Sequence, residues 1–189
     1  MIKYFSVSSK PSSPSRKAKK QNYGEKMKNN TTLFVTRGAM IAALYVALTY
    51  FSSIFGLASG VIQFRLSEML CVLPIFMPEA IIGLTLGCLI SNLITGAVIW
   101  DIIFGSFATL LGAIGAKLLS KLPTKLLWLA TVPTVLSNTV IVPFVLIYAY
   151  GAPDSYPYLM LTVGIGEFVC AGILGSVLCY SLKKSKFLR

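Results

Sequence analysis

The distribution of apolar residues predicts six helices that are long, or nearly long, enough to cross a membrane. Apolar stretches broken by Gly, Pro and charge cover residues 33–55, 65–76, 79–97, 101–121, 125–150 and 158–183. A membrane-spanning helix needs about 20 apolar residues. The second stretch is shorter and ends at Pro74 and Pro78, so we expect it to be tilted or to contain irregular backbone buried by protein. The expected fold is therefore an all-α integral membrane protein with six transmembrane helices.

The N-terminal segment lacks this pattern. Residues 1–31 are rich in Ser, Pro, Lys and Asn, a composition that cannot bury a core and predicts a disordered basic tail. The segment is not typical of a signal peptide, because the apolar stretch after it is of full membrane length and no small-residue cleavage site clearly ends it. We expect two parts, the tail over residues 1–31 and a six-helix transmembrane substrate-binding domain over residues 32–189.

Composition supports the membrane class and argues against a nucleic-acid partner. The chain is 56% hydrophobic and 12% charged, whereas soluble domains carry about 25% charged residues. A net charge of +11 would suit nucleic-acid binding if the basic residues covered a folded surface. They lie instead at the chain ends and in one short loop between apolar stretches, so we expect no nucleic acid to bind.

The position of the basic residues predicts the orientation in the membrane, because Lys and Arg collect in cytoplasmic loops. If the N-terminal tail is cytoplasmic, all but one of the 17 basic residues fall on the cytoplasmic side, and the exception is Arg65. We therefore predict a multi-pass protein of the cell membrane with both termini in the cytoplasm.

Two helices carry small residues at four-residue spacing, which lets helix backbones approach closely in lipid. The first has Ala39, Ala43 and Ala47, and the third has Gly83 and Gly87, followed by Ser91 and Thr95. We expect the glycine face to pack against a neighbouring helix of this chain. The alanine face either packs internally or contacts a partner protein.

Catalytic and metal-binding signatures are missing from the sequence. The four cysteines lie in apolar stretches without metal-ligand spacing, and the chain has no histidine. It has no Walker A loop and no nucleophile arranged with a base. We therefore expect no enzyme activity, no metal and no cofactor, and the energy to concentrate a substrate would have to come from a partner or an ion gradient.

Apart from the tail and the connecting loops, ionisable residues are few, and the topology places these four toward the outer side: Arg65, Glu68, Asp101 and Glu167. Arg65 and Glu68, three residues apart, either form a structural ion pair or contact a ligand. Asp101 either caps its helix or contacts a ligand. Glu167 lies about two and a half turns into the last helix, where an ionised carboxylate would cost about 2.5 to 3.5 kcal/mol. We therefore expect it to face a cavity.

Amide and aromatic side chains occur at a similar predicted depth: Gln63, Asn92, Asn138, Phe64 and Trp100. A carboxylate can accept two hydrogen bonds from a guanine-like N–H/NH2 edge, amides can donate and accept, and an aromatic ring can cover the base. The set predicts a site for a flat, polar heterocycle. Trp100 can alternatively belong to the aromatic belt at the membrane interface.

Three motifs carry a family resemblance. The runs QFRLSE at 63–68, DIIFGSFATLL at 101–111 and VGIGE at 163–167 resemble, in this order, those of the queuosine-precursor transporter family, QueT. The resemblance covers residues 37 to 182. Members of this family are substrate-binding (S) components of energy-coupling factor (ECF) importers.

The resemblance implies a fold, partners and a ligand. It implies a six-helix S component that works with a transmembrane coupling protein and two ATPase subunits, and it implies contact between Ala39, Ala43 and Ala47 and the coupling protein. The ligand would be a 7-deazaguanine base such as queuine or a biosynthetic precursor, and the loop around residues 56–62 would close over it.

The resulting hypothesis is substrate capture from outside. Glu167 would accept from the guanine edge, and the other residues complete or brace the pocket: Gln63, Arg65, Glu68, Asn92 and Asn138. Three alternatives stay open, namely an S component for another vitamin-like heterocycle, a stand-alone secondary transporter, and a structural or regulatory membrane protein.

Overall fold

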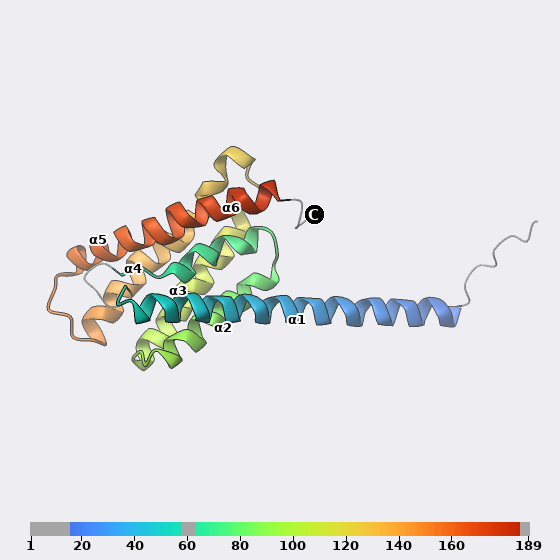
Figure 1. The fold of residues 1–189 in the computed structure, drawn as a ribbon, viewed down its shortest axis with the longest axis horizontal. Coiled ribbons are helices and arrows are strands. Elements are labelled where there is room, and N and C mark those ends of the chain that lie inside the picture. Colours follow the sequence, from blue (N-terminus) through green and yellow to red (C-terminus); the bar gives the residue numbers. More distant parts are fainter. Residues whose placement is uncertain (1–15, 58–62, 186–189) are drawn as a thin grey trace, which may run out of the picture. The chain divides into compact units, whose positions relative to one another are not determined.

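The computed structural model describes residues 16–57 and 63–185, and it describes side chains from residue 30 onward. Within this part of the chain every regular element is a helix (Figure 1). The elements are α1 (Arg16–Ile54), η1 (Leu66–Ile75), α2 (Glu79–Ile94), α3 (Ile99–Leu118), η2 (Leu119–Lys121), η3 (Thr124–Thr131), α4 (Val132–Tyr148), α5 (Tyr156–Glu167), η4 (Phe168–Leu174) and α6 (Gly175–Lys184).

These elements confirm the six apolar helical segments predicted from the sequence. Four are long and apolar enough to span a membrane: Asn30–Ile54, Ile99–Lys121, Thr124–Tyr148 and Tyr156–Lys184. Two shorter apolar helices, Leu66–Ile75 and Glu79–Ile94, lie between the first and second of these. Figure 1 shows α5, η4 and α6 as one continuous helical stretch, in which η4 is a π-helix.

The first helix starts earlier than predicted. Its backbone is helical from Arg16 rather than from residue 33. The chain divides into two units, residues 1–34 and residues 35–189. The disordered tail proposed for residues 1–31 stays a prediction, since residues 1–15 lie outside the described part. The predicted substrate-covering loop around 56–62 also falls almost entirely outside it.

The second apolar segment has the irregular backbone that its length and prolines predicted. η1 is a 3-10 helix of ten residues with Pro74 inside it, and seven of its residues are buried. It packs against α2, α3, η3, η4 and α6. Runs of 3-10 helix longer than three or four residues are uncommon because their hydrogen-bond geometry is poor. The surrounding helices therefore shield this segment from lipid, where unsatisfied backbone groups would be costly.

The main apolar core forms where α1, η1 and α2 meet. It is built from Ile41, Tyr45, Leu70, Cys71, Leu73, Ala80, Leu84, Cys88 and Ala113. The glycine face of α2 makes this approach possible: a Cβ at Gly83 would lie 2.6 Å from the Gly38 carbonyl, and one at Gly87 would lie 2.8 Å from the Tyr45 Cβ. The prediction that the glycine face packs internally is therefore confirmed for Gly83 and Gly87.

Candidate functional site

A polar cavity of about 360 Å³ lies among the apolar helices. Its polar lining comes from five places in the chain: Thr49 and Ser53 of α1, Gln63 and Arg65 before η1, Asn92 and Thr95 at the end of α2, Asp101 of α3, and Tyr150 after α4. Ligand pockets in proteins commonly begin at about 300 Å³, so this cavity can hold a molecule the size of a nucleobase. We call it the main cavity.

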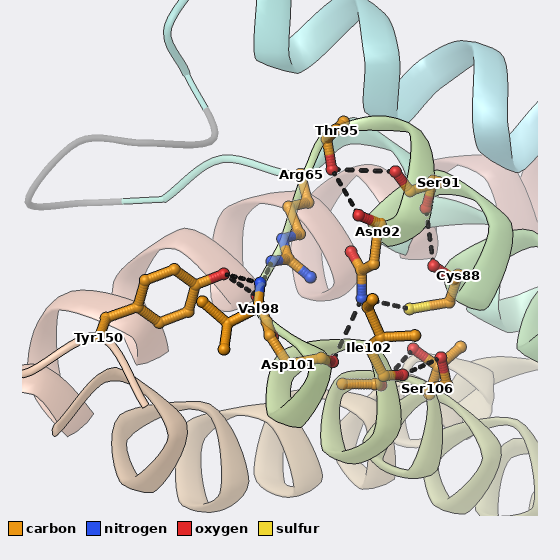
Figure 2. Close-up of polar contacts among 12 residues, drawn as sticks. Arg65, Cys88, Ser91, Asn92, Thr95, Val98, Asp101, Ile102, Ser106 and Tyr150 are labelled. Atoms are coloured by element: carbon orange, nitrogen blue, oxygen red, sulfur yellow. Dashed lines mark hydrogen bonds and ion pairs between the residues drawn. The ribbon is translucent and has the colours of Figure 1, made fainter. Parts of the chain in front are cut away.

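Arg65 and Asp101 form an ion pair in the wall of the main cavity. The Arg65 Nη2 lies 3.7 Å from the Asp101 Oδ2, and both side chains are largely buried. The Tyr150 hydroxyl donates to the same oxygen at 3.0 Å, and Figure 2 shows the Tyr150 and Arg65 side chains both pointing toward the Val98–Asp101 turn. Partial burial raises the pKa of the Tyr150 phenol, so the hydroxyl stays protonated and can donate at neutral pH. The Asp101 Oδ1 is buried without a partner.

Asn92 joins the end of α2 to the start of α3. Its Nδ2 donates to the Asp101 backbone carbonyl at 3.4 Å and contacts the Cys88 sulfur at 3.7 Å, as Figure 2 shows. Thr95, one turn further on, donates to the Ser91 carbonyl at 2.9 Å. The two contacts of its Nδ2 hold the amide of Asn92 at the cavity wall, where it can also meet a ligand.

A second, much smaller cavity adjoins Glu167. It has room for about 10 Å³, roughly one water, and is lined by Gln63, Arg65, Val142, Val163 and Glu167. Gln63 and Arg65 line both cavities, so the segment 63–65 separates them. The Glu167 carboxylate is buried and its Oε2 has no partner. Glu167 therefore borders a small void inside the protein, and its contact with a ligand stays a prediction.

Glycine lets the segment 63–65 lie directly on the helix that carries Glu167. A Cβ added at Gly166 would overlap the carbonyl oxygen of Gln63. At Gly164 it would meet only the Thr139 side chain, at 3.3 and 3.4 Å. The close approach at Gly166 places Gln63 immediately over the smaller cavity.

Arg65 and Glu68 do not form an ion pair with each other, and Glu68 lines neither cavity. The Glu68 Oε1 accepts a hydrogen bond from the Tyr45 hydroxyl at 2.5 Å, and its Oε2 accepts one from the Cys71 thiol at 3.2 Å. Arg65 precedes η1 with an extended backbone (φ −100°, ψ 98°), so its side chain leaves the chain in another direction. The i,i+3 relation of a helix, on which the predicted pair rested, does not apply to it.

The other predicted residues are divided between the site and its surroundings. Asp101 does not cap α3, because the capping position is Val98. Asn138 is buried on α4 and approaches the Glu167 carboxylate, but it lines neither cavity. Phe64 is half-buried and also lines neither cavity. Trp100 is 54% exposed and stacks on Phe104 in an apolar surface groove. It therefore lies outside the main cavity, and its place in an aromatic belt stays a prediction.

Sequence reasoning missed the contribution of α1 to the site. Thr49 and Ser53 line the main cavity. Thr49 also donates to the Ser67 hydroxyl at 2.7 Å, and the Ser52 hydroxyl accepts from the Leu66 amide at 3.1 Å. The available signal was a polar face at helical spacing, because Tyr45, Thr49 and Ser52 or Ser53 follow one another at three or four residues. This face fixes the start of η1.

The alanine face of α1 remains uncovered in the described part of the chain. Ala39, Ala43 and Ala47 are exposed and line an open apolar groove of about 730 Å³ together with Leu86 and Ile90 of α2. The alanine face therefore does not pack against another described helix.

No cluster of metal-ligating side chains forms among the described residues. The site consists of carboxylates, amides, hydroxyls and one guanidinium, which recognise a ligand by hydrogen bonds and charge.

Comparison with known proteins identifies the family. Residues 35–184 match the family model described as QueT transporter. The chain belongs to the QueT transporter family. This confirms the family suggested by the three motifs, and the family together with the apolar helices makes the chain a multi-pass membrane protein.

One curated relative supports the same family. The chain is 36% identical over 103 residues to a protein of Lactococcus lactis subsp. cremoris (strain MG1363) named Queuosine precursor transporter QueT. The aligned region covers 54% of this chain and 60% of that protein. No solved structure matches the chain.

Proposed function

We propose that the chain is the substrate-binding component of an ECF importer and that it captures a queuosine precursor, a 7-deazaguanine base, from outside the cell. The observation that carries the proposal is the main cavity, an open pocket with polar side chains in its lining among otherwise apolar helices. The name of the Lactococcus lactis relative, a queuosine precursor transporter, supports the ligand class.

The chemistry of the lining suits such a base. We assign Glu167 as the acceptor for the N–H/NH2 edge, because a buried carboxylate oxygen without a partner gains most from a donor. Arg65, Gln63, Asn92 and Asp101 orient the base, while Glu68 and Asn138 brace the site from behind. Since the smaller cavity holds about one water, the segment 63–65 shifts when the base reaches Glu167.

Partner and orientation are parts of the same proposal. The open groove at Ala39, Ala43 and Ala47 supports docking of a transmembrane coupling protein that carries two ATPase subunits. The distribution of Lys and Arg supports cytoplasmic N- and C-termini in the cell membrane. With these termini, the segment 63–65 and the main cavity face outward.

A ligand panel tests the proposal. The detergent-purified chain is titrated with queuine, its aminomethyl and nitrile precursors, riboflavin, thiamin, biotin and folate while thermal unfolding is followed. A ligand present at 100 times its Kd stabilises the folded state by about 2.7 kcal/mol, so only the deazaguanines should raise the unfolding temperature clearly. If only another vitamin raised the unfolding temperature, that vitamin would be assigned as the ligand instead of a deazaguanine. If no compound raised it, the proposal would be contradicted.

A stand-alone secondary transporter is the competing function, since buried carboxylates also serve proton coupling. Proteoliposomes that contain only this chain distinguish the two. We expect them to bind the deazaguanine without accumulating it, and to accumulate it once the coupling protein, ATPase subunits and ATP are added. Accumulation by the chain alone under a proton gradient would favour the secondary transporter.

A further inference from the structure

An apolar groove of about 510 Å³ opens on the surface away from the main cavity. One wall is formed by η3 and α4, and the other by η4 and α6. Representative wall residues are Trp128, Val132 and Leu136 on the first and Phe168, Ile173 and Tyr180 on the second. We call it the Trp128 groove.

The length of the Trp128 groove matches one membrane leaflet. Its first wall extends from Trp128 in the 3-10 helix η3 to Leu136 in α4, which corresponds to about 14 Å at roughly 2.0 Å per residue in η3 and 1.5 Å in α4. The hydrocarbon core of a bilayer is about 30 Å thick, so one leaflet is about 15 Å deep. A single acyl chain lying along the groove would therefore be covered by protein over most of its depth.

Lysines gather at the end of the groove marked by Trp128 and Tyr180. The Tyr180 hydroxyl donates to the Lys125 backbone carbonyl at 3.3 Å, which brings α6 to the start of η3. The Lys183 Nζ donates to the Thr124 hydroxyl at 2.7 Å, so its ammonium is held beside Lys125. An ammonium has three donors, and two of those on Lys183 remain for an anion.

The charge of these lysines is not offset by a carboxylate among the described residues. The two ion pairs found there are made by Arg37 with Glu79 and by Arg65 with Asp101. Lys125 and Lys183 are both exposed. This end of the groove therefore carries positive charge beside Trp128 and Tyr180, two residue types that are enriched at membrane interfaces.

We propose that the Trp128 groove binds one anionic phospholipid, with an acyl chain along the groove and the phosphate at Lys125 and Lys183. The apolar walls accept any acyl chain, and the lysines provide the preference for an anionic headgroup. Basic clusters at the ends of membrane helices attract acidic lipids in this way. The proposal is independent of the substrate, because the groove shares no lining residue with the main cavity.

Native mass spectrometry of the detergent-purified chain tests the proposal. Dioleoyl phosphatidylglycerol and dioleoyl phosphatidylcholine are titrated separately, and the lipid-bound fraction is measured. We expect one tightly bound phosphatidylglycerol and weaker phosphatidylcholine. The double variant Lys125→Gln/Lys183→Gln should lose about thirtyfold in phosphatidylglycerol affinity, the effect of two basic residues near an anionic lipid, and should leave phosphatidylcholine binding unchanged.

Two further variants separate the groove from general surface charge. Lys117→Gln removes one positive charge from α3, which does not line the groove, and should retain the preference. Ser176→Phe fills the groove between its walls and should weaken both lipids about equally. Equal binding of the two lipids by the unmodified chain would overturn the proposal. So would an equal loss in Lys117→Gln, or unchanged lipid binding in a folded Ser176→Phe protein.

Discussion

At the residue scale, Arg65 connects the parts of the site. It lines both cavities and pairs with the Asp101 carboxylate, and it occurs where the distribution of basic residues predicts none. The sequence marked Arg65 as exceptional, but one of the two roles that it left open, an ion pair with Glu68, does not occur, and Asp101 takes that place. Asp101 lies 36 positions further along the chain (101 − 65), and only the packing of α3 beside the start of η1 brings the two together. Local spacing contains no information on a contact of that kind.

Replacement of Arg65 separates its structural from its ligand-binding role. Arg65→Gln leaves the Asp101 carboxylate buried without a counter-charge, which costs about 3 to 5 kcal/mol in comparable pairs. We expect a clearly lower unfolding temperature and loss of deazaguanine binding. In Arg65→Gln/Asp101→Asn the unpaired charge is gone, so stability should largely return while binding stays lost. Thermal unfolding and calorimetric titration measure the two effects. Recovery of binding in the double variant would show that Arg65 does not touch the ligand.

Glu167 provides a second test at this scale. Removing one partner of a buried charge-assisted hydrogen bond costs about 2 to 5 kcal/mol, so Glu167→Gln should weaken deazaguanine binding by at least tens-fold in a calorimetric titration. Trp100→Phe is the matched control, because Trp100 lies outside the main cavity and should leave the affinity unchanged. Normal affinity in Glu167→Gln would remove this residue from the site.

At the scale of elements, the sequence predicted which segments form helices better than it predicted their type. Hydropathy and proline positions were enough to locate all six apolar segments, and the shortness of the second one indicated irregular backbone. The 3-10 geometry of η1 and the π-helix that follows Glu167 have no such signal. Both depend on packing: η1 is held by hydrogen bonds from the polar face of α1, and η4 packs against it.

The contact between the segment 63–65 and α5 predicts the effect of a single methyl group. Gly166→Ala places a Cβ against the backbone carbonyl of Gln63, and such overpacking typically costs about 1 to 3 kcal/mol. We expect the segment to be displaced from Glu167. The free energy of deazaguanine binding should then be reduced by more than the free energy of unfolding. Titration calorimetry and thermal unfolding measure the two quantities.

Gly164→Ala is the matched control for this variant. Its Cβ would meet only the Thr139 side chain, which can give by a few tenths of an ångström. Affinity close to that of the unmodified chain is therefore expected. If both alanine variants bind equally well, the position of Gln63 over Gly166 is not part of ligand recognition.

At the scale of the whole molecule, the two small-residue faces of the chain behave differently. Gly83 and Gly87 of α2 pack directly against α1, whereas the alanine face of α1 is open. The sequence pattern alone could not separate these cases, because both stripes have the same spacing and only the rotation of each helix decides what it faces. An open small-residue face in lipid favours a second protein, since close backbone approach is the main gain available there.

Ala43→Leu therefore tests assembly without touching the site. The larger side chain projects into the middle of the alanine groove and keeps a partner helix at a distance, so we expect deazaguanine binding by the isolated chain to be unchanged. Co-purification with the ECF coupling protein and ATP-dependent uptake in proteoliposomes should both be lost. Met40→Leu is the control, because Met40 is 68% exposed and lies outside the groove lining. Uptake by Ala43→Leu at the normal rate would mean that the coupling protein docks on another face of the chain.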